Sequence, residues 1–410
     1  MPRLKRLVFN FIDMDPLRVG GAARLAQCLA QHVPAHAGFP LQTLVAVGHA
    51  AWEQHFPLAG AFETLDASGL GKWGSGQAIE RALDPPGPGR RVSLALARPF
   101  QRGFRFPESW AADTIVHVPT QVIHPRPPKH WNLPYVMNLA DIQHEHFPEF
   151  FSPRDLAKRR QRFGESAQAA AAICVADEWT RRDILAHLPV SADKVHAIPL
   201  APTWDLSQVP SPGDAAACCA ALGLPERFAF YPAQTWAHKN HARLFEALAA
   251  LKEQGIVIPL ACCGHLNEHH PRLLERSAEL GLEGQIHWLG LRSEAEVRSL
   301  YVASQLVVVP TLFEGGPGIP VLEAMALQKP LAAAAVCGIP EAVGEDALVF
   351  DPFNPADMAA ALRKLWMDEG FARELAARGK ARISLRTWAK TAEAYLGVYE
   401  AALGQAPANR

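Results

Sequence analysis

A single stretch, Val307–Pro330, carries most of the residues that could do chemistry. It begins with an apolar run that predicts a buried strand over Leu306–Val309, continues as a Gly/Pro-rich loop, and then reads as a helix that opens near residues 319–320. Glu314 lies in the loop and Glu323 on the predicted helix, with eight residues between them. A strand, a glycine loop and a helix in this order can form an anion site from the backbone alone.

The glycines of this loop indicate a phosphate, and the carboxylates that flank it indicate a polyol. Glycine lacks a Cβ and tolerates positive φ, so Gly315, Gly316 and Gly318 let the backbone approach a ligand closely. The following helix directs unpaired N–H groups and the positive end of its dipole toward the loop. Carboxylates beside such a site accept hydrogen bonds from hydroxyls. The stretch therefore predicts a site for a sugar nucleotide.

A cation that could reach the same phosphates occurs in the segment YPAQTWAHKNH, Tyr231–His241. Lys239 follows a predicted strand, Phe228–Pro232, at a strand-to-helix connection. Ligands of parallel sheets bind beyond the carboxyl ends of the strands, so this lysine is predicted to bind a diphosphate. The plainer alternative is a solvated lysine at the start of a helix.

The segment DIQHEHFPEFFS, Asp141–Ser152, holds two alternating histidines. On a strand this spacing would put His144 and His146 on one face, but no third metal ligand lies nearby in the sequence, so no metal site is predicted. His144 follows a predicted strand, Tyr135–Leu139, and is expected to face a cleft in reach of a donor sugar or an acceptor. A hydrogen-bonded structural histidine is the alternative.

Length and composition describe an ordinary globular chain. Its 410 residues predict two or three domains, and a net charge of −1 implies no bulk polyanion as partner. The seven cysteines show no CxxC spacing, which favours buried free thiols in a reducing compartment. The N-terminus reads as a strand, with neither a signal peptide nor a membrane span predicted, so we expect a cytoplasmic protein, at most peripheral at the inner face of the membrane.

Short apolar runs alternate with amphipathic helical patterns along the chain, which predicts parallel α/β structure. A Pro-rich segment, Pro199–Gly213, has the composition of a linker between two such units. Residues 67–110 are expected to form loops and one helix near Gln77–Leu83. The predicted strands are Arg6–Ile12, Gln42–Val47, Thr114–Val118, Tyr135–Leu139, Ala171–Val175, Lys194–Ile198, Phe228–Pro232, Pro259–Cys263, Gln285–Leu289, Leu306–Val309, Leu331–Val336 and Ala347–Phe350.

Four segments in order resemble family 4 retaining glycosyltransferases of the GT-B fold, the group 1 glycosyltransferases. They are the Gly20–Gly21 turn, DIQHEHFPEFFS, YPAQTWAHKNH and FEGGPGIPVLEA (Phe313–Ala324). The resemblance spans nearly the whole chain. It implies two doubly wound Rossmann-like domains that face each other across a cleft: residues 1–200 for the acceptor and residues 201–385 for the nucleotide sugar. A C-terminal helix, about 386–410, is expected to pack back on the first domain.

The resemblance also implies roles for individual residues. Glu323 is expected to accept hydrogen bonds from the ribose hydroxyls, and Glu314 to face the transferred sugar. Gly20 and Gly21 bring the first helix close to the cleft. The residues expected to act in catalysis are His144, Asp141, Lys239 and Glu314. Those expected to bind the nucleotide sugar are Gly20, Gly21, Gln234, Lys239, Gly315, Gly316, Gly318 and Glu323, and no metal is expected.

Three features depart from the family pattern. An arginine expected five residues before Lys239 is Gln234, which can donate a hydrogen bond but supplies no charge. A histidine expected before Asp141 is Ala140, and the loop between the glutamates holds one extra residue, near Pro317.

The predicted function is therefore a retaining, metal-independent glycosyltransferase. Its donor would be a nucleoside-diphosphate sugar, with GDP-mannose favoured by analogy with bacterial mannosyltransferases, and no cofactor is needed. The acceptor would be a saccharide, free or lipid-linked, as in the biosynthesis of surface polysaccharides, and no nucleic acid is expected as partner. Arginines at 98, 102 and 105 and the run Lys158–Arg162 could contact an anionic acceptor. The alternatives are a GT-B sugar-nucleotide epimerase and a non-catalytic sugar-nucleotide-binding homologue.

Overall fold

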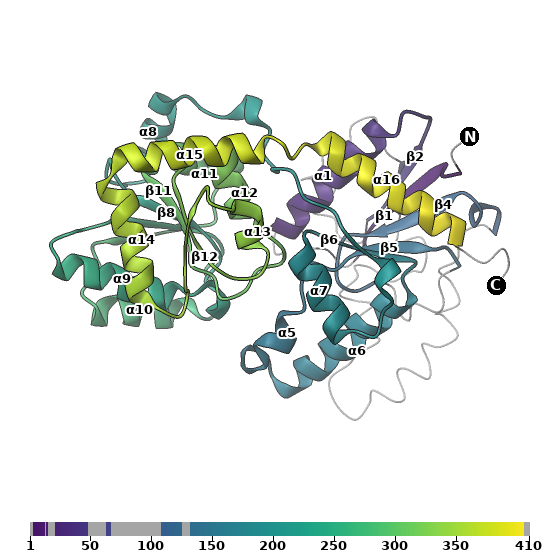
Figure 1. Ribbon diagram of the computed structural model, residues 1–410, viewed down its shortest axis with the longest axis horizontal. Helices are drawn as coiled ribbons and strands as arrows, with labels where there is room; N and C mark the ends of the chain where they lie inside the picture. Colours follow the sequence, from purple (N-terminus) through teal and green to yellow (C-terminus); the bar gives the residue numbers. More distant parts are fainter. Residues whose placement is uncertain are drawn as a thin grey trace. The chain divides into compact units, whose positions relative to one another are not determined.

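The computed structural model describes residues 3–12, 14, 21–47, 63–66, 108–124 and 132–405. The chain forms two compact units, one of residues 1–199 with 388–410 and the other of residues 200–387. Each unit has a parallel sheet with helices on both faces (Figure 1). The fold predicted from the sequence, two Rossmann-like α/β units, is confirmed. Gly20, the helix expected near Gln77–Leu83 and the arginines at 98, 102 and 105 lie outside the described residues.

The sheet of the first unit has the strand order β3-β2-β1-β4-β5-β6-β7. Its strands are β1 (Arg6–Phe11), β2 (Gln42–Val47), β3 (Glu63–Asp66), β4 (Thr114–Val118), β5 (Tyr135–Asn138), β6 (Ala172–Val175) and β7 (Val195–Ala197). The helices used below are α1 (Gly21–His36), α5 (Gln143–His146), α6 (Pro153–Ala169), α7 (Glu178–His187) and α16 (Trp388–Gln405). β3 was not predicted, because ETLD is short and has no apolar run.

The two faces of this sheet bury alternate residues of each strand, as the period of two in a strand requires. On β1, Phe9 belongs to the core shared with α1 and α16, whereas Val8 belongs to the core shared with α6. α1 and α16 pack side by side, although most of the sequence separates them (Figure 1).

Two tyrosines fasten α16 to the sheet of the first unit. The hydroxyl of Tyr395 donates to the side-chain oxygen of Asn138 at 3.0 Å, and that of Tyr399 lies 3.0 Å from Nδ1 of His117. Burial lowers the pKa of His117 to about 3, so its ring is neutral and can accept this hydrogen bond. The last described helix of the chain is thus part of the core of the first unit.

The sheet of the second unit has the strand order β10-β9-β8-β11-β12-β13. Its strands are β8 (Ala229–Pro232), β9 (Leu260–Cys263), β10 (Ile286–Gly290), β11 (Leu306–Val309), β12 (Leu331–Ala334) and β13 (Leu348–Phe350). Its helices are α8 (Pro212–Ala221), α9 (His241–Glu253), α10 (His270–Glu279), α11 (Glu294–Ala303), α12 (Ile319–Ala326), α13 (Ile339–Val343), α14 (Pro355–Met367) and α15 (Glu369–Ile383).

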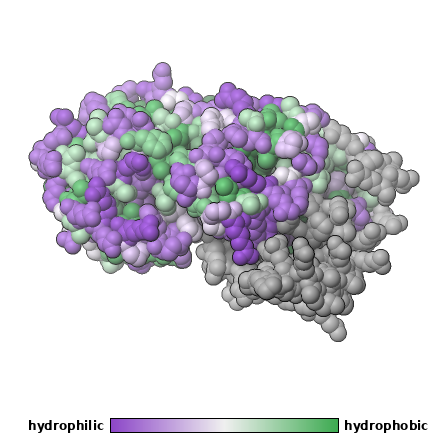
Figure 2. All heavy atoms as spheres, turned by 90° about the horizontal axis from the view of Figure 1, so that it is seen from below, coloured by the Kyte–Doolittle hydropathy of each residue, from purple (hydrophilic) through white to green (hydrophobic). Residues whose placement is uncertain are grey.

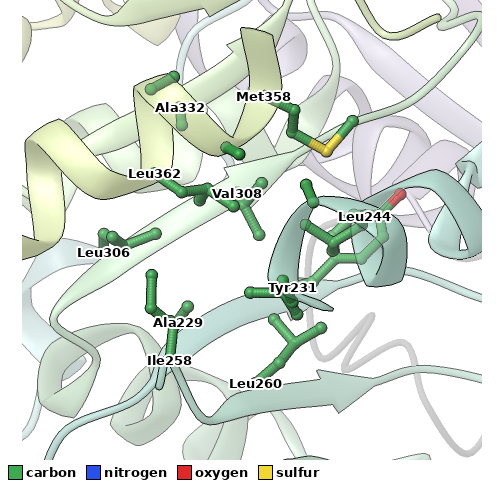
Figure 3. Packing of buried hydrophobic residues seen from close by; sticks show 14 of the residues in the cluster. Ala229, Tyr231, Leu244, Ile258, Leu260, Leu306, Val308, Ala332, Met358 and Leu362 are labelled. Atoms are coloured by element: carbon green, nitrogen blue, oxygen red, sulfur yellow. The ribbon is translucent and has the colours of Figure 1, made fainter. Parts of the chain in front are cut away.

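A dense core joins this second sheet to α9 and α14. Leu306 and Val308 of β11 pack with Leu244 of α9 and with Met358 and Leu362 of α14 (Figure 3). All five side chains are fully buried. Burying a large aliphatic side chain stabilises a fold by roughly 1.5–3 kcal/mol, so this core fixes the strands whose ends form the site below.

The segment predicted as a linker is packed against the second unit. Trp204 is buried, and Pro212 already begins α8. On the face shown in Figure 2, hydrophilic residues cover most of the described surface and hydrophobic ones are scattered among them. None of the described helices has both the length and the apolar character that crossing a bilayer requires.

Candidate active site

The order of the strands in the second sheet locates its binding edge. From β8 the chain proceeds outward through β9 and β10, and from β11 it proceeds outward in the opposite direction through β12 and β13. The neighbours β8 and β11 therefore flank the topological switch point, where open α/β sheets bind ligands beyond the carboxyl ends of their strands. Lys239 follows β8 and Glu314 follows β11.

The turn that carries Lys239 is tied to the loop after β11. Lys239 ends a short 3₁₀ helix, Ala237–Lys239, and its carbonyl accepts a hydrogen bond from the hydroxyl of Tyr231 at 2.7 Å. The next residue, Asn240, has a left-handed φ of 61°, and its side-chain amide donates to the carbonyl of Pro310 at 2.9 Å. The carbonyl of His238 accepts from the backbone N–H of residue 312 at 2.7 Å. These bonds hold the two loops together.

Lys239 and Glu314 form an ion pair at this switch point. The ammonium of Lys239 donates to Oε1 of Glu314, and the two side chains are only 18% and 10% exposed. The backbone N–H of Glu314 contacts the sulfur of Cys337 at 3.4 Å. Two residues 75 positions apart in the sequence are thus brought together, as their predicted places at one sheet edge require.

Two of the three glycines in the loop have the positive φ that glycine tolerates, whereas Gly315 does not. Gly316 and Gly318 have positive φ, 75° and 76°, and Gly318 is the residue that precedes α12. A Cβ on Gly318 would lie 3.5 Å from the side chain of Glu314. A side chain at either position would therefore be strained by the positive φ, and at Gly318 its Cβ would lie in van der Waals contact with Glu314.

Glu323 lies on α12, as predicted, and two protein hydroxyls already bind its carboxylate. Thr203 donates to Oε1 at 3.0 Å, and Tyr301 of α11 donates to Oε2 at 2.8 Å. The residue is 6% exposed. A carboxylate accepts about four hydrogen bonds, so the ribose contact predicted for Glu323 has to share it with these two hydroxyls. Thr203 and Tyr301 were not predicted; neither lies in a motif of the sequence.

Gln234, which replaces the expected arginine, is linked to an exposed tryptophan. The indole N–H of Trp236 donates to the side-chain oxygen of Gln234 at 2.7 Å, and Trp236 is 42% exposed. This bond uses the oxygen of the amide, so the side-chain NH₂ of Gln234 is the group that could donate to a phosphate.

Asp141, His144 and Gly21 belong to the first unit. Oδ1 of Asp141 accepts from the backbone N–H of Gln143 at 3.1 Å at the start of α5, and Gly21 is the first residue of α1. His144 is 1% exposed, and its ring lies 4.9 Å from that of Phe163, edge to face. Burial lowers the pKa of His144 to about 4, so its imidazole is neutral at pH 7.

The structure corrects the interpretation of the two histidines in QHEH. Residues 143–146 form a helix, not a strand, so residues two apart point in different directions. His144 is buried, whereas Nε2 of His146 lies 2.8 Å from Oδ1 of Asp183. A carboxylate that could act as a further metal ligand beside His146, which the local sequence did not offer, therefore comes from Asp183 on α7. It could not be found from spacing because 37 residues separate His146 from Asp183.

The geometry of the second unit fits an anionic ligand that carries hydroxyls. It combines a cation, a positive-φ glycine loop with a helix start, and two largely buried carboxylates. Lys239, Glu314 and the loop glycines meet at one edge of one sheet, whereas Asp141 and His144 lie on the other unit.

Comparison with known proteins agrees with this geometry. Residues 221–382 match the family model described as "Glycosyl transferases group 1". The chain is 26% identical over 274 residues to the O-antigen chain mannosyltransferase B of Escherichia coli, covering 65% of this chain and 70% of that protein. It is 32% identical over 209 residues to a D-inositol 3-phosphate glycosyltransferase of Nocardioides, covering 47% of this chain and 45% of that protein.

Two solved structures show that the fold is shared along the chain. HepE of Anabaena, solved in complex with UDP and glucose, superposes with a TM-score of 0.71 at 18% identity, covering 97% of this chain and all of that one. Sucrose-phosphate synthase from Thermosynechococcus elongatus superposes with a TM-score of 0.72 at 18% identity, covering 98% of this chain and 99% of that one.

Proposed function

We propose that the chain transfers a hexose from a nucleoside-diphosphate sugar to a saccharide. The proposal starts from the family, because the match to the group 1 glycosyltransferases lies in the second unit, at residues 221–382. GDP-mannose is the favoured donor. The names of two relatives support mannose as the transferred sugar: the O-antigen mannosyltransferase and an MMP alpha-(1->4)-mannosyltransferase of Mycolicibacterium hassiacum that is 28% identical over 231 residues. The first of these also supports an acceptor of the surface-polysaccharide class, free or lipid-linked.

The observation that carries the proposal is the Lys239–Glu314 pair at the switch point of the second sheet. Lys239 and the amides of the glycine loop supply positive potential where a leaving diphosphate gathers charge. Glu314, fixed by Lys239 and by its contact with Cys337, accepts hydrogen bonds from the transferred sugar. Glu323 accepts hydrogen bonds from the ribose in addition to those from Thr203 and Tyr301.

We further propose that the transfer retains the anomeric configuration and needs no divalent ion. Lys239 and the loop amides stabilise charge on the diphosphate, which is the work that a metal ion does in other transferases. A double displacement would need a carboxylate nucleophile and an acid/base group close together across the reacting bond. Glu314 is committed to Lys239, so the proposal favours attack on the same face that the diphosphate leaves, with the departing phosphate taking the proton of the acceptor.

A thermal-shift screen with GDP, UDP, ADP and their sugars tests the donor. A ligand that binds only the native state at about 100 times its Kd stabilises that state by about 2.7 kcal/mol. GDP and GDP-mannose should raise the melting temperature most. A stronger effect of UDP or ADP would overturn the choice of base, and no effect of any nucleotide would overturn the site. Donor turnover that depends on a saccharide acceptor then separates a transferase from an epimerase.

A further inference from the structure

The side chains of His146, Asp183 and His187 converge in the first unit. Asp183 and His187 are four residues apart on α7, so they lie on one face of that helix, and His146 reaches them from the end of α5. One ligand atom from each of the three side chains lies within 4.8 Å of the other two. Among the described residues, no other three histidine, cysteine or carboxylate side chains bring their ligand atoms this close together.

The carboxylate of Asp183 lacks part of the bonding that its burial requires. Its side chain is 6% exposed, and both nearby histidines contact the same oxygen: Oδ1 lies 2.8 Å from Nε2 of His146 and 3.2 Å from Nδ1 of His187. The other oxygen, Oδ2, is buried and has no hydrogen-bond partner among the described residues. A buried carboxylate oxygen without a hydrogen-bond partner is unfavourable, and a cation bound beside the carboxylate would offset that cost.

The donor set selects the class of cation. Two imidazoles and one carboxylate suit a borderline transition-metal ion such as Zn²⁺, whereas Mg²⁺ and Ca²⁺ prefer oxygen ligands. Zinc bonds of about 2.0–2.1 Å in a tetrahedron place the ligand atoms about 3.3 Å apart. The observed separation of 2.8 Å between Nε2 of His146 and Oδ1 of Asp183 needs only a small side-chain movement to reach that spacing.

The neighbouring charges leave these three groups as the ligands. Glu145 is next to His146 in sequence, but its carboxylate is held by Arg160, with the closest contact at 2.8 Å. His187 donates from Nδ1 to the backbone carbonyl of Asp183 at 2.8 Å, which orients its ring and leaves Nε2 as the nitrogen that could bind the ion.

We propose that His146, Asp183 and His187 bind one Zn²⁺ ion, which fastens α5 to α7. α5 belongs to the segment that carries Asp141 and His144, so the ion would order that segment. The site belongs to the first unit and the diphosphate site to the second, and the inference does not rest on the proposed transferase reaction.

Calorimetric titration of the full chain, first freed of metals with EDTA, tests the site. The wild-type chain should bind one equivalent of Zn²⁺ and show a higher melting temperature with Zn²⁺, but not with Mg²⁺ or Ca²⁺. His146→Gln changes a partly exposed side chain at a helix end, so it should fold normally. It should lower the affinity for Zn²⁺ at least about 100-fold, since changing even a residue that only supports a metal ligand costs 10- to 100-fold.

His187→Gln and Asp183→Asn should weaken zinc binding in the same way. His36→Ala, which removes an exposed histidine from the end of α1 in the same unit, should leave zinc binding unchanged and serves as the control. Far-UV circular dichroism establishes that each variant is folded. No binding by the wild-type chain would overturn the proposal. So would an equivalent of Zn²⁺ that His146→Gln binds as tightly as the wild type.

Discussion

Replacing Lys239 with alanine tests whether this side chain binds the diphosphate or only neutralises Glu314. In the structure Lys239 is 18% exposed and pairs with a carboxylate that is 10% exposed, so any phosphate contact would be made in a largely dry place. A charge-assisted hydrogen bond there contributes about 1.5–3 kcal/mol, or about 10- to 150-fold in affinity. In the reaction, negative charge develops on the leaving group. The fall in kcat/KM should therefore correspond to a loss of about 2–4 kcal/mol in transition-state stabilisation.

The same substitution leaves the Glu314 carboxylate without its cation. Breaking a buried ion pair by removing one partner costs about 3–5 kcal/mol, and the residual exposure of this pair reduces that to about 1–3 kcal/mol. The double variant Lys239→Ala/Glu314→Gln should therefore recover most of the lost stability. It should not recover the affinity for the nucleoside diphosphate beyond about 1 kcal/mol, which is the repulsion between the lone carboxylate and the phosphates.

Calorimetric titrations with a nucleoside diphosphate and the matching monophosphate separate the two roles. Lys239→Ala should weaken the diphosphate strongly and the monophosphate little. Lys252→Ala, an exposed lysine near the end of α9 that donates to a carbonyl at 2.6 Å, is the matched control. Unchanged diphosphate affinity in a destabilised Lys239→Ala variant would refute the assignment and leave Lys239 as a structural partner of Glu314.

Four further outcomes are expected. Glu323→Ala should weaken the nucleoside diphosphate itself and lower the melting temperature, because two hydroxyls lose their acceptor, whereas Glu323→Gln should lower mainly the affinity; calorimetry that finds only the sugar nucleotide affected would contradict the ribose contact. Gln234→Arg should preserve or tighten nucleotide binding, because it adds charge at the diphosphate, and a tenfold weaker titration would speak against that position. In His146→Gln, which lacks the proposed zinc site, the activity with EDTA should nearly equal the activity without it. NMR of the anomeric proton should show that the product keeps the configuration of the donor. Loss of activity that only Mg²⁺ or Mn²⁺ restores, or an inverted product, would refute the mechanism. Burial lowers the pKa of His144 in the folded chain to about 4, so between about pH 4 and 6.5 the unfolded chain binds more protons than the folded one. The free energy of unfolding should therefore fall as the pH is lowered through that window, and it should fall less steeply in His144→Phe. Urea titrations that give equal slopes for the two chains would disprove this.

Most of the fold could be predicted because the strands are buried on both faces and read as short apolar runs. The predicted strands over Leu306–Val309 and Thr114–Val118 agree with β11 and β4 at both ends. β3 could not be predicted, since ETLD has no such run and pairs only at the edge of the sheet. QHEH was compared with strand periodicity, but four residues are too few to distinguish a strand from one helical turn.

Residues of the candidate site could be predicted where they lie in a recognisable motif. Their contact partners could not be predicted where these lie far away in the sequence. The sequence could predict that Glu314, Lys239 and the loop glycines lie close together, because each belongs to a connection that follows a strand of the same sheet. The partners of Glu323 were missed, because Thr203 lies in a Pro-rich segment read as a linker and Tyr301 in an ordinary amphipathic helix. Asp183 and His187 were missed for the same reason: only the packing of α5 on α7 brings them to His146.

The position of α16 has a consequence for how the chain is made. The first unit contains residues from both ends of the sequence, and its core includes Tyr395 and Tyr399. During synthesis, residues 1–199 leave the ribosome long before α16 has been made. His117 and Asn138 therefore lack the hydroxyl groups of Tyr399 and Tyr395 until the end of translation. The second unit, continuous from 200 to 387, is complete first. A stop codon just before Trp388 would thus leave the second unit complete, but it would remove α16 from the core of the first unit.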